Sequence, residues 1–439
     1  MKVLKFGGTS VGSAQRMKEV AKLITDGERK IVVLSAMSGT TNTLVEISDY
    51  LYKKNPEGAN EIINKLESKY RQHIDELFAT PEYKQKGLEL IKSHFDYIRS
   101  YTKDLFTLFE EKVVLAQGEL ISTAMMNYYL QECGVKSVLL PALEYMRTDK
   151  NAEPDPVYIK DKLQVQLELH PDAEIYITQG YICRNAYGEI DNLQRGGSDY
   201  TASLIGAAIN ASEIQIWTDI DGMHNNDPRI VDKTAPVRHL HFEEAAELAY
   251  FGAKILHPTC IQPAKYANIP VRLLNTMDPT APGTLISNDT EKGKIKAVAA
   301  KDNITAIKIK SSRMLLAHGF LRKVFEIFES YQTSIDMICT SEVGVSVSID
   351  NTKHLNEILD DLKKYGTVTV DHDMCIICVV GDLEWENVGF EAKALDAMRD
   401  IPVRMISFGG SNYNISFLIR KEDKNKALQS LSDHLFNNK

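Results

Sequence analysis

The fold is decided near the N-terminus by the stretch VLKFGGTSVGSAQRMKEVAKLITDGERKIVVLSA, Val3 to Ala36. VLKF and IVVLSA are short apolar runs flanked by Gly, Ser and Thr, which is typical of buried strands. Apolar residues recur between them at helical spacing: Met17, Val20, Ala21 and Ile24. Gly27 is well placed to end that helix. A strand, a loop, a helix and a second strand in this order predict a parallel sheet.

The alternation of strands and helices continues along the chain. Further strands are predicted over 137–142, 174–182 and 213–220, with a helix over 200–210. From about Thr43 to Thr123 the apolar spacing is helical, and the obvious interruptions are Pro56 and Pro81. This segment, 43–123, is predicted to be a helical elaboration of the first domain. We expect a three-layer α/β domain with a mostly parallel sheet over residues 1–297.

After the turn-rich stretch from Met277 to Gly293 the pattern changes to two ferredoxin-like units in tandem. In the first unit, strands are predicted over 304–310, 334–340, 344–350 and 367–370, with helices over 319–331 and 354–365. In the second, strands are predicted over 374–380, 402–408 and 413–419, with helices over 388–400 and 425–436. We place these units at 298–373 and 374–439. The second has no clear closing strand, so the two copies are expected to share or exchange an element.

Composition and charge exclude several functional classes. Hydrophobic residues make up 44% of the 439 residues and charged ones 25%, as in ordinary folded proteins. No apolar run approaches the ~20 residues that span a bilayer, and the N-terminus lacks a signal-peptide pattern, so we expect a cytoplasmic protein. The net charge of -9, without clustered Lys and Arg, argues against a nucleic-acid surface. An anionic small substrate must therefore meet locally placed cations.

The cysteines are spread along the chain in the manner of reduced thiols: Cys133, Cys183, Cys260, Cys339, Cys375 and Cys378. Cys375 and Cys378 form a C-x-x-C pair within an apolar strand, where their odd spacing points the two sulfurs to opposite faces. We therefore expect neither disulfides nor a metal or redox site.

The first segment with candidate chemistry is KFGGTSVGS, Lys5 to Ser13, at the junction of the first strand and helix. Its glycines and small hydroxyl residues let backbone N–H groups approach a phosphate at a helix N-terminus, and Lys5 adds a point charge. It is not a Walker A loop, because its lysine precedes the glycines. In isolation it could equally be a simple strand-to-helix turn.

Three further segments complete the candidate set. QRGGSDYTA, Gln194 to Ala202, is a second glycine turn that enters a helix, and its Arg195 can clamp a carboxylate at two points. WTDIDGMHNNDPR, Trp217 to Arg229, follows a strand and offers Arg229 to phosphate, although alone it would be read as a surface loop. FGAKILHP places Lys254 among apolar neighbours, where a lone lysine usually extends to solvent.

With these four segments in this order and spacing, the chain resembles the aspartokinases, which have the amino acid kinase fold. The matching motifs are KFGGTSV, LSAMSGTTN, QGELIST, RGGSDYTA, WTDIDG with DPR, and FGAKILHP. Paired ACT domains are expected to follow, so the resemblance covers essentially the full length. The helical segment before QGELIST and the motif SIDMICTSEV look most like the monofunctional, lysine-sensitive members.

The resemblance implies a role for each matching residue. It implies catalytic roles for Lys5, Asp199 and Lys254. ATP binding is implied for Lys5, Gly7, Gly8, Thr218, Asp219, His224, Arg229, Lys254 and Ile255, and aspartate binding for Ser35, Thr41, Glu119, Arg195, Ser198 and Asp199. An allosteric lysine site is implied at Met314, Phe320, Leu321, Ser334, Ile335, Asp336, Ser341 and Glu342. The implied partners are L-aspartate, ATP with Mg²⁺, regulatory L-lysine and a second copy of the chain, with no resident metal.

The chemistry of phosphate transfer to a carboxylate agrees with these roles. A carboxylate of pKa ~3.9 is already ionised at neutral pH, so it needs no general base. Its obstacle is repulsion from the polyphosphate, which fixed cations and magnesium overcome. Lys5 and Lys254 are the candidates for that neutralisation, while Arg195 would hold the α-carboxylate and Glu119 the ammonium or its network. Asp199 would orient the lysines or a magnesium-bound water.

The chain departs from the family pattern at several positions, none of which is one of the charged residues assigned above. His224 stands where a tyrosine is common, Gln194 where a glycine is common, and Ala317 where a serine is common. Cys183 and Arg184 replace a glycine-containing turn. Two alternatives therefore stay open beside an active aspartate kinase: a kinase of the same fold with another acidic substrate, and a catalytically silent amino-acid sensor.

Overall fold

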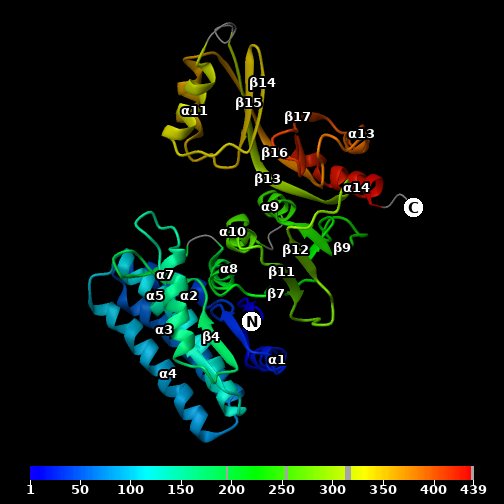
Figure 1. The fold of residues 1–439 in the computed structure, drawn as a ribbon. Helices are drawn as coiled ribbons and strands as arrows, with labels where there is room; N and C mark the ends of the chain where they lie inside the picture. Colours follow the sequence, from blue (N-terminus) through cyan, green and yellow to red (C-terminus); the bar gives the residue numbers. More distant parts are fainter. Residues whose placement is uncertain (194–195, 253–255, 312–317, 437–439) are drawn as a thin grey trace. The chain divides into compact units, whose positions relative to one another are not determined.

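The computed structural model describes residues 1–193, 196–252, 256–311 and 318–436. The chain forms two compact units, coloured along the sequence in Figure 1. The first unit is Met1–Met223 with Ile255–Asn288, and the second is His224–Lys254 with Asp289–Lys439. Each unit has hydrophobic clusters of its own.

A mostly parallel sheet forms the centre of the first unit. Its strands lie in the order β12-β11-β7-β1-β2-β4-β3. Their bounds are β1 Lys2–Phe6, β2 Lys30–Leu34, β3 Ser137–Leu140, β4 Ile175–Gln179, β7 Ile214–Thr218, β11 Val271–Asn275 and β12 Thr284–Ser287. Neighbours from β11 to β3 pair in parallel, and β12 pairs antiparallel with β11. The carboxyl ends of β7, β1, β2 and β4 therefore meet at one edge, on either side of the point where the strand order reverses.

Helices cover both faces of this sheet and give three layers. Their bounds are α1 Ala14–Ile24, α2 Thr40–Tyr52, α3 Pro56–Leu77, α4 Pro81–Ser100, η1 Tyr101–Lys103, α5 Leu108–Glu132, α6 Ala142–Tyr145, α7 Pro156–Glu168, α8 Gly197–Ile209, η2 Pro258–Ile261 and α10 Gln262–Tyr266. A small hairpin joins β5 Ile182–Arg184 to β6 Ile190–Asn192. Leu4 and Phe6 belong to the cluster that includes α1 and α5, while Lys5, pointing the other way, faces α8.

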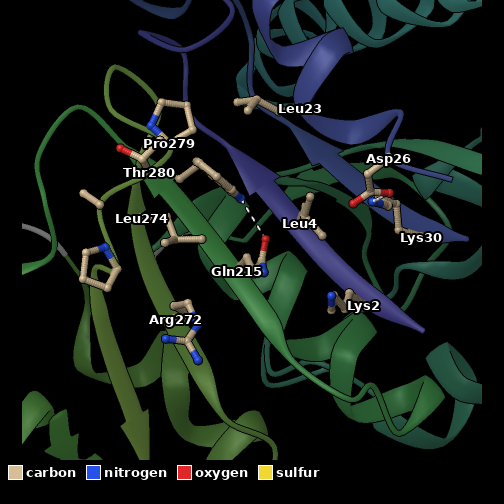
Figure 2. A pocket seen from close by; sticks show the side chains of 13 residues that line it. Lys2, Leu4, Leu23, Asp26, Lys30, Gln215, Arg272, Leu274, Pro279 and Thr280 are labelled. Atoms are coloured by element: carbon tan, nitrogen blue, oxygen red, sulfur yellow. Dashed lines mark hydrogen bonds and ion pairs between the residues drawn. The ribbon is translucent and has the colours of Figure 1, made fainter. Parts of the chain in front are cut away.

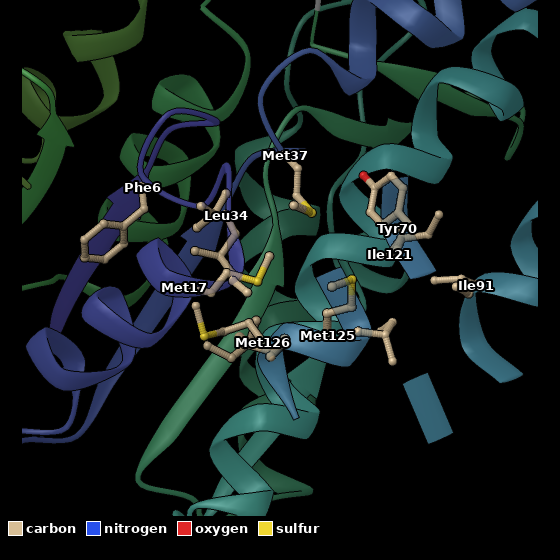
Figure 3. Packing of buried hydrophobic residues seen from close by; sticks show 14 of the residues in the cluster. Phe6, Met17, Leu34, Met37, Tyr70, Ile91, Ile121, Met125 and Met126 are labelled. Carbon is tan, nitrogen blue, oxygen red and sulfur yellow. The ribbon is translucent and has the colours of Figure 1, made fainter. Parts of the chain in front are cut away.

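The core of the first unit joins the sheet to the helical elaboration. Figure 3 shows Phe6 and Leu34 of the sheet and Met17 of α1 in one cluster with Met125 of α5 and Tyr70 of α3. α5 is buried around much of its circumference, because the sheet lies on one side and α2 and α4 on others. This position of α5 places its Glu119 in the interior.

The predicted interruptions of the helical elaboration mark helix starts. Pro56 begins α3 and Pro81 begins α4, where a missing backbone N–H breaks no intrahelical hydrogen bond. Asn55 caps α3 by accepting a hydrogen bond from the Gly58 N–H at 3.0 Å. The prediction of helices separated at these two prolines is confirmed.

A second, antiparallel sheet organises the other unit, with its strands in the order β14-β15-β13-β16-β18-β17. The bounds are β13 Ile295–Lys310, β14 Met337–Ser341, β15 Gly344–Ile349, β16 Thr367–Gly381, β17 Val403–Ser407 and β18 Asn414–Arg420. The helices are α9 Phe242–Tyr250, α11 Phe320–Ser330, α12 Leu355–Lys363, α13 Phe390–Ala397, η4 Lys421–Asp423 and α14 Lys424–Leu435. Short strands β8 Met223–His224, β9 Pro236–Val237 and β10 His239–His241 precede α9.

The two long strands β13 and β16 run through both ferredoxin-like units. The second half of β13 pairs with β15, and the second half of β16 pairs with β18. The first half of β13, Ile295 to Lys301, pairs with the second half of β16. It thereby supplies the closing strand that the second ferredoxin-like unit lacks in its own sequence. α11 and α12 pack over the core of the first ferredoxin-like unit, and α13 and α14 pack over the core of the second ferredoxin-like unit.

Several strands differ from the prediction, which was wrong about their extent. β13 begins at Ile295 rather than at 304, and β16 is continuous where two strands, 367–370 and 374–380, were predicted. β11 and β12 were not predicted. Asn303 and Asp373 have φ of 60° and 54°, so an irregularity between the halves interrupts the apolar alternation while pairing continues. The cysteines are free, as predicted. Within the described ranges, no helix is long and apolar enough to cross a membrane.

Candidate active site

The glycine turn after β1 lies where the backbone of two loops comes close together. A Cβ added to Gly8 would lie 2.9 Å from the Ala36 carbonyl oxygen. The Gly8 carbonyl accepts a hydrogen bond from the Ser38 N–H at 3.2 Å. A Cβ added to Gly7 would lie 3.3 Å from Lys5 Nζ. The turn therefore needs glycine for close packing, and it places backbone groups beside a lysine ammonium.

Lys5 and Asp199 form an ion pair at this edge of the sheet. Lys5 Nζ lies 2.8 Å from Asp199 Oδ1, and the two side chains are 12% and 15% exposed. Lys5 comes from the end of β1 and Asp199 from the first turn of α8. A carboxylate near a helix N-terminus is stabilised by the helix dipole, so Asp199 can hold Lys5 in a fixed position.

A second contact joins β2 to α8. Ser35 Oγ donates a hydrogen bond to Ser198 Oγ at 2.8 Å. A Cβ added to Gly180 would lie 2.4 Å from the Ser198 Cβ, so only glycine fits where β4 ends. Gly196, directly before α8, has φ of 76°, a left-handed conformation that favours glycine. The glycines thus allow α8 to enter close to the strand ends.

Glu119 of α5 is the buried carboxylate of this region. Glu119 is 3% exposed, and its Oε1 accepts a hydrogen bond from the Ala36 N–H at 3.2 Å. No described residue donates a hydrogen bond to Oε2. Burial raises the pKa of Glu119 to about 7, against the opposing effect of the Ala36 hydrogen bond. A cationic group beside Oε2 would favour the ionised form.

The N-termini of two helices lie beside these side chains. Thr41 is in the first turn of α2, which begins directly after the loop that contacts Gly8. α8 begins at Gly197 beside the Ser35–Ser198 contact. Unpaired N–H groups at helix N-termini favour anions, so this edge can accept a phosphate or a carboxylate.

Thr218 and Asp219 stand at the end of β7, the neighbour of β1. The Thr218 carbonyl accepts a hydrogen bond from the Thr276 N–H at 2.8 Å, and its hydroxyl accepts one from the Ile220 N–H at 3.3 Å. Asp219 is exposed. The first unit therefore brings together the predicted residues Lys5, Gly7, Gly8, Ser35, Glu119, Ser198 and Asp199, with Thr41, Thr218 and Asp219 on elements at the same sheet edge.

Two predicted nucleotide residues belong to the second unit. His224 Nδ1 lies 3.0 Å from Thr234 Oγ1. Arg229 is exposed and pairs with Asp227, with Nη2 2.7 Å from Oδ2. The hydrogen bonds from the Arg229 side chain lower the pKa of Asp227 below its usual value. Arg195, Lys254, Ile255 and Met314 lie outside the described residues, as do Gln194 and Ala317.

The predicted effector residues of the second unit differ in their surroundings. Phe320 belongs to the core beneath α11, whereas Leu321, Ser334, Ser341 and Glu342 are exposed and Ile335 is half-buried. The Asp336 side chain is only 1% exposed. Asp336 and Glu342 lie on either side of β14, and six residues of extended chain span roughly 20 Å. One small amino acid can therefore reach only one of these two carboxylates within a single chain.

Sequence reasoning missed two residues near Glu119. Gly180 and Tyr181 follow β4, and Tyr181 has φ of 70° and donates its backbone N–H to Thr201 Oγ1 at 3.0 Å. Burial, with the charge of Glu119 next, raises the pKa of Tyr181 to about 12. The signal available in the sequence was the position of both residues directly after an apolar strand, at the same sheet edge as Lys5.

A pocket of ≈ 400 Å³ on the α1 face of the sheet does not suit a polyphosphate. Figure 2 shows Lys2, Lys30 and Arg272 along it, near the amino ends of β1, β2 and β11. Lys2 pairs with Glu28 at 2.8 Å, Arg272 pairs with Glu213 at 3.1 Å, and Lys30 pairs with Asp26. These cations are already neutralised, and they lie at the end of the sheet opposite Lys5.

The carboxyl edge of the first unit thus combines a glycine turn, a fixed lysine, two helix N-termini and a buried carboxylate. These are the parts of a site that positions an anionic group next to a phosphate and neutralises their charge. Comparison with known proteins agrees: a model of the amino acid kinase family matches residues 1–275, and an ACT domain model matches residues 377–435. The chain belongs to the amino acid kinase family.

Relatives define its place within that family. Aspartokinase 1, chloroplastic, of Arabidopsis thaliana is 35% identical over 457 residues, covering 99% of this chain and 80% of that protein. Lysine-sensitive aspartokinase 3 of Escherichia coli (strain K12) is 32% identical, covering 99% of both chains. The crystal structure of E. coli aspartokinase III with aspartate and ADP matches with a TM-score of 0.84, at 32% identity, over 99% of this chain and 100% of that one. Within the amino acid kinases, the chain is an aspartokinase, and the predicted fold with ACT domains is confirmed.

Proposed function

We infer that the protein transfers the γ-phosphate of ATP to the side-chain carboxylate of L-aspartate, giving 4-phospho-L-aspartate. The observation that carries the substrate assignment is Glu119, a buried carboxylate whose Oε2 accepts no hydrogen bond from the described residues. It offers an ammonium a partner close to the Lys5–Asp199 pair, where phosphate would bind. A substrate with an ammonium and a nucleophilic carboxylate fits this combination. The product is the activated acid from which lysine, threonine and methionine synthesis starts.

Each charged residue then has a distinct task. Lys5, held by Asp199, would neutralise the transferring phosphoryl group, and Lys254 would add a second charge. Gly7 and Gly8 would let backbone groups approach the phosphates, with Thr218, Asp219, His224, Arg229 and Ile255 toward the nucleotide. Ser35, Thr41 and Ser198 would position the amino acid with Arg195 and Glu119. Mg²⁺ would enter with ATP as part of the substrate and would offset the negative charge of its phosphates.

ATP-dependent hydroxamate formation tests this function. Hydroxylamine traps an acyl phosphate, so the enzyme with ATP and aspartate should give the hydroxamate, while glutamate should give little. A preference for glutamate would mean a related kinase with another acidic substrate. No product with either acid would mean a catalytically silent amino-acid sensor. The intact Lys5–Asp199 pair favours the active kinase over the sensor.

Arg195→Ala should raise the KM for aspartate by about tenfold or more and change the KM for ATP little, because this guanidinium is proposed to clamp the α-carboxylate at two points. Initial rates over a range of each substrate measure both constants. Arg29→Ala is the matched control, since Arg29 directly precedes β2, at the opposite sheet edge, and donates to the Pro171 carbonyl at 2.9 Å. Equal effects on the two KM values would contradict the assigned role.

We propose that L-lysine inhibits the enzyme through the first ACT unit. Its side-chain ammonium needs a carboxylate, and Asp336 is the buried candidate, with a side chain that is only 1% exposed. Asp336→Ala should therefore raise the lysine concentration that gives half-maximal inhibition at least tenfold. Inhibition curves with lysine, threonine and methionine measure this, with Asp361→Ala as a control from the same unit. Inhibition by threonine alone would remove lysine as the regulator.

We also propose that the protein is a homodimer located in the cytoplasm. Asp336 and Glu342 lie on either side of β14, so a ligand site that uses both carboxylates requires two copies of the chain. The shared strands of the two ACT units make the regulatory region a single body on which copies can associate around a two-fold axis.

A further inference from the structure

A cluster in the second unit already surrounds the Asp336 side chain with partners from two other segments. Lys301 Nζ lies 2.8 Å from Asp336 Oδ1 and 2.9 Å from Asp350 Oδ2. The Tyr250 hydroxyl donates a hydrogen bond to Asp336 Oδ1 at 2.8 Å. Lys301 Nζ also lies 4.4 Å from the centre of the Tyr250 ring. Asp336 therefore has a resident ammonium in the position where a cationic ligand would bind.

Lys301 and Tyr250 belong to segments that are packed together. Lys301 lies in β13, and Tyr250 is the last residue of α9. Just after α9, a Cβ added to Gly252 would lie 2.2 Å from the carbonyl oxygen of Ala300, the neighbour of Lys301. The backbone after α9 thus lies directly against β13. Tyr250 precedes Lys254, the proposed catalytic lysine, by four residues.

We propose that Lys301 is an internal competitor of the regulatory ligand and that Tyr250 is the residue that senses its displacement. A ligand ammonium that pairs with Asp336 Oδ1 takes the place of Lys301 Nζ, which retains Asp350 as a partner. The Tyr250 hydroxyl then shares Asp336 with the ligand instead of with Lys301. The hydrogen bond that fixes the end of α9 changes as a result. The proposal rests on the proposed regulation by an amino acid with a side-chain ammonium. Lys301 and Tyr250 are positioning residues for the segment that leads to Lys254.

Removing the resident cation should strengthen ligand binding. Lys301→Met keeps most of the side-chain length without the charge, so lysine should bind about tenfold more tightly, since it no longer competes with a partner that occupies Asp336 for most of the time. Isothermal titration of the full chain with L-lysine measures the Kd. Lys424→Met is the matched control, because Lys424 pairs with Asp302 at 2.6 Å in the other ACT unit. An unchanged or weaker affinity in a folded Lys301→Met protein overturns the competition.

Removing the Tyr250 hydroxyl should separate binding from inhibition. Tyr250→Phe keeps the ring over Lys301, so the Kd for lysine should stay within about threefold, while the maximal inhibition at saturating lysine should fall by about half or more. Tyr331→Phe is the control, since the Tyr331 hydroxyl donates to Asp361 at 2.8 Å in the same ACT unit. Full inhibition of Tyr250→Phe overturns the sensing role, and this holds even if Lys301→Met does not fold.

The same titrations distinguish the failure of this inference from that of the proposed regulation. Lysine binding to Lys301→Met but not to the wild type supports the resident cation and overturns lysine regulation of the wild type. Binding to neither protein overturns both. Kinase activity without lysine is measured in parallel. A wild type without aspartate kinase activity, which would overturn the proposed function, is therefore recognised separately.

Discussion

Lys5→Ala should lower kcat by on the order of 100-fold or more while the protein stays folded. Lys5 Nζ is fixed by Asp199 at 2.8 Å, and a Cβ on Gly7 would lie 3.3 Å from it, so the ammonium stands at the turn proposed to hold the phosphates. A charge held in place before the reaction stabilises the transition state without reorganisation. Its loss should therefore affect the chemical step more than substrate binding.

The control for this substitution lies on the same strand. Lys2 begins β1 and pairs with Glu28 at 2.8 Å, and both of these side chains are more than one-third exposed. Lys2→Ala should leave kcat and both KM values close to the wild-type values, because exposed ion pairs contribute little. Circular dichroism checks the fold of each variant. A Lys5→Ala enzyme with the kcat of the wild type would remove Lys5 from the phosphate site.

Most of the fold could be predicted because its local signals agree with its packing. The first strand, helix and second strand follow their apolar spacing, and Pro56 and Pro81 lie at helix starts where proline is tolerated. The sharing of β13 between two ACT units could not be predicted in detail. Strand pairing is a long-range property. The sequence from Ile295 to Lys301 has no local pattern that indicates pairing with β16 rather than the end of the first domain.

The candidate site was predictable where its residues follow strands, and less so where burial decides their chemistry. Lys5 and Asp199 come from glycine turns that the sequence shows directly. The resident partner of Asp336 could not be found in this way, because Lys301 is an ordinary lysine of a strand and Tyr250 an ordinary helical tyrosine until the fold brings them together. Such contacts depend on tertiary structure that no spacing reveals.

Glu119→Gln should abolish a pH dependence of stability that the wild type shows near neutrality. Burial raises the pKa of Glu119 from 4.5 to about 7. Because its pKa is higher in the folded state, the folded protein binds the proton more tightly than the unfolded chain. The contribution of Glu119 to the free energy of unfolding is therefore greatest below pH ~4.5, falls as pH rises, and is lost above pH ~7. At ~1.36 kcal/mol per pKa unit, the total change is about 3 kcal/mol.

Urea unfolding at pH 5.5 and pH 8 measures this difference. The wild type should lose about 2 kcal/mol more than Glu119→Gln between these two pH values, since most of the titration of Glu119 falls within that window. Aspartate at saturating concentration should reduce the loss, because its ammonium is proposed to stabilise the ionised carboxylate beside Oε2. The KM of the wild type for aspartate should accordingly fall as pH rises through 7, while that of Glu119→Gln should stay high and flat. Parallel pH profiles for the two proteins, in both unfolding and KM, would show that Glu119 neither titrates near neutrality nor meets the substrate ammonium.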